Sequence, residues 1–188
     1  MDASDDDLIR RYRDGDARAF DVLFDRHHAA VYHFAATMLG EGPAAEDVLQ
    51  ESFLAVARAA REYEPRGRMR AWLMRIVRNR CLNRIEQDRR RREVTGQVDA
   101  ADAVAGDPAP DAGLAADEAA AIVRSAIDEL PERQREAITL YAFERMTYRE
   151  IASVLEMPIN TVKTLIHRAR ASLAAALGPG QRESQREL

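Results

Sequence analysis

The chain has 188 residues, with 28 Lys and Arg against 32 Asp and Glu, and a single cysteine. This length suits one domain or two small ones, and a lone cysteine excludes an intramolecular disulfide. No apolar stretch approaches the roughly 20 residues that a membrane-spanning helix needs, and the acidic start, Met-Asp-Ala-Ser-Asp-Asp-Asp, is unlike a signal peptide. We therefore expect a cytoplasmic protein without membrane insertion.

Apolar residues recur at helical spacing in residues 5–13, 17–39 and 44–62, and Gly-rich turns separate these segments. The third segment also carries a flank of residues spaced i, i+3, i+4 and i+7, which a helix brings to one side. This flank consists of Asp47, Gln50, Glu51 and Leu54.

A strongly basic block follows, although the chain as a whole carries a net charge of −4. Residues 58–92 hold thirteen Arg against four acids, a local charge suited to a phosphate backbone. Pro65 and Gly67 mark residues 63–68 as a loop, and residues 69–90 have the pattern of a helix with an apolar stripe and a basic outward face. A merely solvated surface helix would mix Glu with Arg at i, i+4, so we favour nucleic-acid contact.

Residues 95–117 contain no aromatic or basic residue and show no periodicity, which predicts a flexible acidic linker. A structureless loop of this length is unusual within one domain. We therefore predict an all-α protein of two small helical domains, with an N-terminal bundle at 1–93, a linker at 94–117, a second domain at 118–177 and a tail at 178–188.

Helical patterns return at residues 118–130, 132–143, 147–155 and 159–177. Thr147 and Glu150 fit a capping box, and a short helix, a tight turn and a second helix make the helix-turn-helix plan that places the second helix in a major groove. That second helix carries no acid, and an ordinary αα-hairpin is the alternative. Its outward polar positions include Asn160, Thr161, Lys163, Thr164, His167 and Arg168.

Two stretches resemble the sigma factors of bacterial RNA polymerase, of the small extracytoplasmic-function type. The first joins Ala-Glu-Asp-Val-Leu-Gln-Glu-Ser-Phe-Leu at 45–54 to Arg-Ala-Trp-Leu-Met-Arg-Ile-Val-Arg-Asn at 70–79. The second runs from Asp-Glu-Leu-Pro-Glu at 128–132 through Thr-Tyr-Arg-Glu-Ile-Ala at 147–152 to the helix containing Thr-Val-Lys-Thr at 161–164. Both stretches occur in the order and spacing of that family.

The resemblance implies a promoter-specificity subunit without catalysis or cofactor, whose partners are core RNA polymerase, promoter DNA and an anti-sigma factor. It implies that the 47–54 flank docks on the polymerase clamp helices and that the last helix, with Thr147 and Tyr148, reads the minus-thirty-five element. It also implies that the 63–68 loop captures a flipped base of the minus-ten element. The residues implied to contact the minus-ten element are Tyr63, Arg66, Arg68, Arg75, Arg78, Asn79 and Asn83.

The sequence departs from the family pattern at Glu156, where Gly is usual in the helix-turn-helix turn, and at Leu165, where Arg is frequent. Glu156 suggests a turn of different geometry, because a left-handed conformation there costs about 1 kcal/mol. The histidines lack metal-ligand spacing, and no nucleophile or Gly-rich loop joins the carboxylates, so we expect no metal and no small-molecule substrate. The competing hypothesis is a free-standing helix-turn-helix regulator that binds duplex DNA without polymerase.

Overall fold

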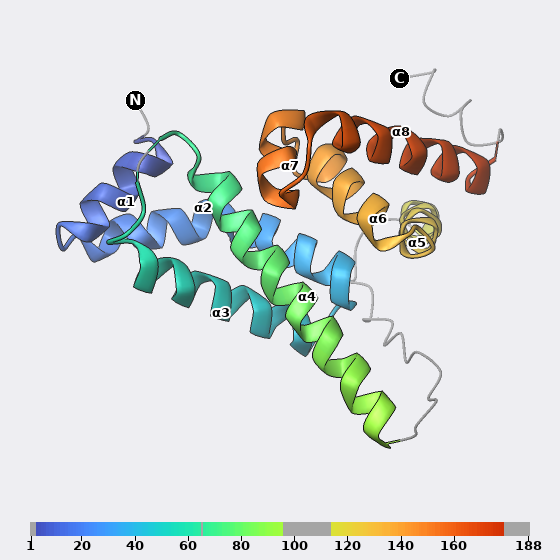
Figure 1. Cartoon of the computed structure of the whole chain (residues 1–188), viewed down its shortest axis with the longest axis horizontal. Coiled ribbons are helices and arrows are strands. Elements are labelled where there is room, and N and C mark those ends of the chain that lie inside the picture. The colour runs from blue at the N-terminus through green and yellow to red at the C-terminus, as the bar shows by residue number, and fades with distance from the viewer. Residues whose placement is uncertain (1–2, 65, 96–113, 179–188) are drawn as a thin grey trace. The chain divides into compact units, whose positions relative to one another are not determined.

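The computed structural model describes residues 3–64, 66–95 and 114–178, and all regular elements within these ranges are helices (Figure 1). The chain divides into two compact units, one built on the first four helices and the other on the remaining ones. Most of the predicted acidic linker, residues 96–113, and most of the predicted tail, residues 179–188, lie outside the described residues.

The N-terminal unit consists of α1 (Asp5–Arg13), α2 (Ala17–Leu39), α3 (Pro43–Ala59) and α4 (Met69–Thr95). The long helix α2 packs against the other three helices. The first two helices have the predicted bounds, because a serine caps one and Gly-containing turns end both. The other two differ: α3 ends three residues before the predicted position, and α4 continues five residues beyond it.

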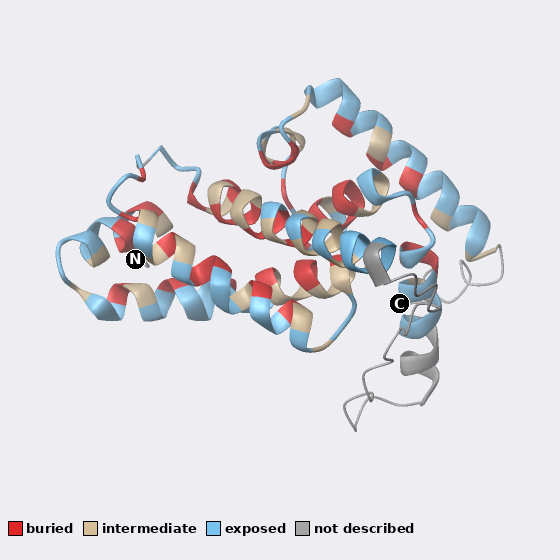
Figure 2. Cartoon of the chain, turned by 60° about the horizontal axis from the view of Figure 1, so that its bottom comes forward, coloured by how far each residue is buried: buried red, intermediate tan, exposed pale blue. Residues whose placement is uncertain are grey.

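The core of this unit lies where the inward faces of α1 to α4 meet, and Figure 2 shows the buried residues along these faces. Of the apolar residues of α4 that recur at helical spacing in the sequence, Leu73 and Val77 are fully buried, whereas Trp72, Ile76 and Leu82 are only half-buried. The fully packed positions of this helix are one to four residues apart along one side of it. They are Met69, Leu73, Met74, Val77 and Cys81.

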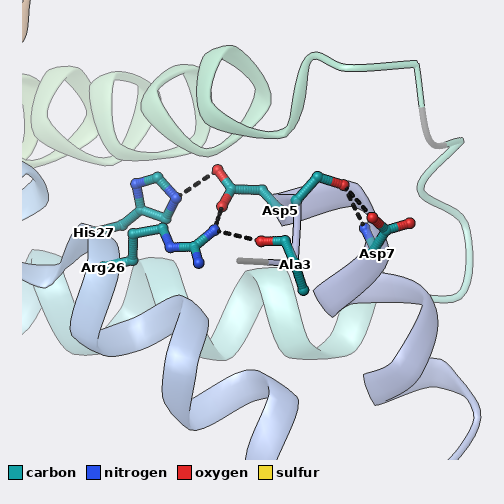
Figure 3. A network of polar contacts seen from close by, with 6 residues as sticks. Ala3, Asp5, Asp7, Arg26 and His27 are labelled. Atoms are coloured by element: carbon teal, nitrogen blue, oxygen red, sulfur yellow. Dashed lines mark hydrogen bonds and ion pairs between the residues drawn. The ribbon is translucent and has the colours of Figure 1, made fainter. Parts of the chain in front are cut away.

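A polar network ties the start of α1 to α2 (Figure 3). The Asp5 carboxylate lies 2.8 Å from Nε2 of His27 and accepts a hydrogen bond from Arg26 at 2.7 Å. The hydrogen bond with His27, and then that with Arg26, holds the pKa of Asp5 below its usual value against the opposing effect of burial. This network fixes α1 against α2 at the end of the helix that also carries Asp6.

The C-terminal unit consists of α5 (Leu114–Asp128), α6 (Glu132–Ile138), the π-helical turn η1 (Thr139–Phe143), α7 (Tyr148–Leu155) and α8 (Ile159–Ala176). Helix α8 packs against α5 and α6. Two predictions are corrected here: α5 begins four residues before 118, inside the predicted linker, and the predicted helix at 132–143 is α-helical only to Ile138.

The predicted capping box opens α7. The Glu150 carboxylate accepts hydrogen bonds from the backbone N–H of Thr147 at 2.8 Å and from its hydroxyl at 2.7 Å, while Thr147 Oγ1 accepts from the Glu150 N–H at 3.3 Å. At the other end, Glu156 has φ of 54° and the Met157 N–H bonds to the Ala152 carbonyl at 3.1 Å. This is the left-handed helix end that glycine usually supplies, so the turn keeps that geometry in spite of the glutamate.

Candidate functional site

The predicted flank of α3 is an exposed ridge. All four of its residues are exposed, and the Leu54 side chain stands out as a large apolar group that is 55% exposed. The two acids of the ridge are not isolated, because Arg84 of α4 lies 3.2 Å from Asp47 and Arg80 of α4 lies 2.6 Å from Glu51. The ridge therefore presents carboxylates that already have basic partners within the same unit.

The loop between α3 and α4 is anchored by a residue that the sequence analysis missed. Asp6 of α1 is buried, and its carboxylate accepts hydrogen bonds from the Tyr63 hydroxyl at 2.8 Å and from the Gly67 N–H at 2.5 Å. Asp6 is the middle residue of a run of three acids, and it lies three residues before the buried Ile9. That spacing was the only sequence signal that this acid faces inward.

Tyr63 is correspondingly not presented to solvent. Its side chain is 8% exposed, and its ring packs on Trp72 with 4.7 Å between ring centroids. Burial, and then the hydrogen bond to Asp6, raises the pKa of Tyr63. Arg66 and Arg68 are exposed on the same loop, and Arg66 forms an ion pair with Glu64. The structure thus separates the predicted loop residues into a buried tyrosine and two exposed arginines.

Three of the four predicted minus-ten residues on α4 share one outward stripe. Arg75, Asn79 and Asn83 are spaced four residues apart, and the two asparagines are exposed while Arg75 is half-buried. Arg78 is the exception, since it is 5% exposed. Its position is four residues after Met74 and three before Cys81, so it falls at the edge of the inward stripe, and its placement on the outward face is corrected.

The outward face of α8 carries the predicted reading residues. Val162, Ile166 and Ala169 are buried on the inward side, and the helix has no acid along its length. The Thr164 hydroxyl donates to the Asn160 carbonyl at 3.0 Å, so its oxygen can still accept a hydrogen bond. The predicted reading residues are all exposed, and they are Asn160, Thr161, Lys163, Thr164, His167 and Arg168.

An aromatic stack supports the start of α7. The rings of Tyr148 and Tyr141 are parallel within 7°, with 5.2 Å between centroids, and the Arg170 guanidinium lies 4.8 Å from the Tyr141 centroid. The hydrogen bond from Tyr148, and then the Arg170 charge, lowers the pKa of Tyr141, whereas the same hydrogen bond raises the pKa of Tyr148. The predicted residue Tyr148 thus stacks on the π-helical turn, whose Tyr141 in turn contacts α8, while Thr147 is exposed beside it.

The described residues show neither a membrane-spanning helix nor a cluster of metal ligands. No helix within residues 3–64, 66–95 and 114–178 combines the length and apolar character needed to cross a bilayer. The same part of the chain contains no group of three or more His, Cys, Asp or Glu side chains arranged to hold a metal ion.

Two protein families match this chain in the order of its two units. Residues 23–91 match the family described as Sigma-70 region 2, and residues 120–173 match the family described as Sigma-70, region 4. The first match covers most of α2, all of α3 and most of α4, including the ridge and the outward stripe, and the second covers the helix-turn-helix.

Whole-chain comparisons agree with these matches. The chain is 35% identical over 188 residues to the RNA polymerase sigma-H factor of Pseudomonas aeruginosa, covering 96% of this chain and 97% of that one. It is 30% identical over 184 residues to the ECF RNA polymerase sigma-E factor of Escherichia coli, covering 94% and 95%.

Solved structures are similar as well. The sigma factor RpoE of Bartonella quintana, solved with the anti-sigma factor NepR, superposes with a TM-score of 0.74 at 25% identity, over 86% of this chain and 98% of that one. CnrH, solved with the cytosolic domain of CnrY, superposes with a TM-score of 0.70 at 29% identity, over 93% and 97%.

Proposed function

Because the chain belongs to the sigma-70 family, as a sigma factor of the extracytoplasmic-function type and a promoter-specificity subunit of RNA polymerase, we propose a binding partner for each of its exposed surfaces. The unit of α1 to α4 docks on core polymerase and holds the opened minus-ten element. The unit of α5 to α8 reads the minus-thirty-five element as intact duplex. The chain performs no catalysis itself, since the polymerase makes the transcript.

The docking surface is the exposed ridge of α3. Its two carboxylates suit a basic partner surface, and Leu54, at the C-terminal end of the ridge, supplies an apolar contact that becomes buried on binding. Because Arg80 and Arg84 already pair with the acids, docking exchanges one set of ion pairs for another. Pairs at this exposure are each worth about 0.2–1 kcal/mol, so the exchange costs little.

The minus-ten surface combines the exposed arginines of the loop with the outward stripe of α4. Arg66 and Arg68 are placed for phosphates of a single strand, and Arg75, Asn79 and Asn83 follow along the helix. The buried Arg78 stays outside this contact set. Opening a base pair costs a few kcal/mol, which pocket contacts to the flipped base offset.

The minus-thirty-five surface is the outward face of α8, and its acid-free composition is the single observation that carries the duplex-reading proposal. Asn160 can pair with adenine in the major groove, and Lys163 or Arg168 with guanine edges or phosphates. Thr147 and Tyr148 at the start of α7 are placed for the flanking backbone.

We further propose an anti-sigma factor as the controlling partner, because the similar Bartonella quintana sigma factor was solved with one. A partner of this kind acts where polymerase does, so we propose a cytoplasmic location. The domain boundaries near residues 93 and 118 belong to the same proposal, and the family matches at 23–91 and 120–173 support them.

Run-off transcription tests this proposal. Purified chain added to core polymerase on a fragmented genomic library should produce transcripts whose start sites lie downstream of a shared pair of promoter elements. The chain should co-elute with core polymerase and bind isolated duplex promoter only weakly. Tight duplex binding with no affinity for core polymerase would instead support the free-standing helix-turn-helix regulator.

A further inference from the structure

Asp6 joins two points of the α3–α4 loop through one buried carboxylate. Oδ1 accepts a hydrogen bond from the Tyr63 hydroxyl at 2.8 Å, and Oδ2 accepts one from the Gly67 N–H at 2.5 Å. These partners lie 57 and 61 residues away in the sequence and four residues from each other within the loop. The carboxylate therefore ties both loop residues to α1.

The buried Asp6 carboxylate depends on these two hydrogen bonds. Asp6 is 8% exposed, and a buried carboxylate is costly unless hydrogen bonds satisfy it. Charge-assisted hydrogen bonds of this kind are about twice as strong as neutral ones. Gly67 has φ of 67°, a conformation that side-chain-bearing residues rarely adopt, and in this loop its N–H is directed at the carboxylate. The loop conformation and the position of α1 are therefore coupled.

The attachment continues to the outward stripe of α4. The Tyr63 ring, held by its hydroxyl, packs on Trp72 at 4.7 Å with an angle of 30° between the planes. Trp72 lies three residues before Arg75 and is only half-buried, so it shares the side of α4 on which Asn79 and Asn83 are exposed. A chain of contacts thus runs from Asp6 through Tyr63 to the ring that begins this stripe.

We propose that Asp6 is a positioning residue for single-strand capture. It holds the loop and, through Tyr63, the Trp72 ring in the arrangement that receives a base of the opened strand. Tyr63 then acts as an anchor inside the unit, and the base is received by Trp72 with the exposed loop arginines. This inference rests on the proposed minus-ten function.

The test uses the full chain bound to core polymerase and fluorescent single-stranded oligonucleotides of the non-template minus-ten sequence. Each oligonucleotide of the set carries one abasic site at a different position. Stacking of one base contributes about 1–3 kcal/mol, so removing the captured base should weaken wild-type binding about 5- to 150-fold. Oligonucleotides with the abasic site at other positions measure the contacts that the chain makes with the bases that are not captured.

Asp6→Asn is nearly isosteric, but its amide nitrogen would face an N–H or O–H donor. We expect it to weaken binding of the intact oligonucleotide at least about 5-fold. We also expect it to abolish the abasic penalty, which is the loss of affinity caused by an abasic site, at the captured position. Penalties at the other positions and affinity for core polymerase should not change. Asp7→Asn is the matched control, because Asp7 is exposed and bonds to Ser4 and Arg10 on its own helix.

Tyr63→Phe keeps the ring on Trp72 and removes only the hydroxyl, so it tests the same attachment if Asp6→Asn fails to fold. It should reduce the same abasic penalty. A folded Asp6→Asn or Tyr63→Phe chain with the full wild-type pattern of penalties would overturn the inference and leave Asp6 a residue of the fold alone. A wild-type chain with no abasic penalty at any position would overturn single-strand capture itself, and the inference with it.

Discussion

Glu51 of α3 and Arg80 of α4 form an ion pair, with 2.6 Å between Oε2 and Nη1. The pair lies on the ridge that we propose for polymerase docking, and Asp47 is paired in the same way with Arg84. The acids of the ridge are therefore held in place before a partner arrives, and a basic partner must compete with two arginines of the same unit.

Replacing both arginines with glutamine should release the ridge for its partner. Arg80→Gln with Arg84→Gln removes both internal competitors, so the affinity for core polymerase, measured without DNA, should rise by about 2- to 30-fold. Arg89→Gln with Arg90→Gln is the matched control, because these exposed arginines pair with glutamates of their own helix. A tenfold loss of affinity would show that Arg80 and Arg84 contact the polymerase directly.

Reversing the charge of the ridge should abolish docking. Asp47→Arg with Glu51→Arg places two cations against a basic partner and beside Arg84 and Arg80, while both side chains are exposed and the core is untouched. Affinity for core polymerase should become unmeasurable, with little change in the thermal unfolding midpoint.

Asp21→Arg with Asp25→Arg is the control for that variant. These two exposed acids of α2 have the same spacing and undergo the same charge change. If both double variants lose core binding equally, net charge rather than the α3 ridge determines docking.

Truncating the basic residues of α8 should weaken promoter recognition in the holoenzyme. Lys163→Ala and Arg168→Ala should each lower the promoter-binding free energy by about 1–3 kcal/mol if the side chain reads a guanine edge. If the side chain contacts a phosphate, the slope of log affinity against log salt concentration should instead fall by about one. Arg124→Ala, exposed on α5, is the control. Transcription from all templates at the wild-type level would contradict the reading role of α8.

Removing the Asp5 charge should destabilise the N-terminal unit in a pH-dependent way. Because hydrogen bonding keeps the folded-state pKa of Asp5 below its unfolded value of about 3.9, its contribution is present above that pH and is lost as the pH falls through the folded pKa. Asp5→Asn should lower the free energy of unfolding by about 1 kcal/mol at neutral pH.

Urea denaturation at several pH values measures this difference. The gap between the wild type and Asp5→Asn should close at low pH, whereas Asp21→Asn, which alters an exposed carboxylate on α2, should show almost no gap at any pH. A gap that persists below the folded pKa would mean that the Asn variant is destabilised by packing and not by lost charge.

Most of the helical architecture follows from local sequence. The bounds of α1 and α2, the capping box at Thr147 and the exposed face of α8 were all predictable, because apolar periodicity and caps act over one or two turns. The family motifs likewise lie within single helices or adjacent ones. Each of these features depends on residues that are close to one another in the sequence.

Tertiary contacts decided the rest. The sequence left Tyr63 open to a base and placed Arg78 on the outward face, whereas the structure buries both. Periodicity gives a helix its faces but does not tell which neighbour covers the edge of each face. The Asp6 attachment and the pairing of Glu51 with Arg80 join residues that are 29 to 61 positions apart. Only folding brings such groups within hydrogen-bonding distance, so the sequence determined which helices form and the packing determined which of their charges remain available to a partner.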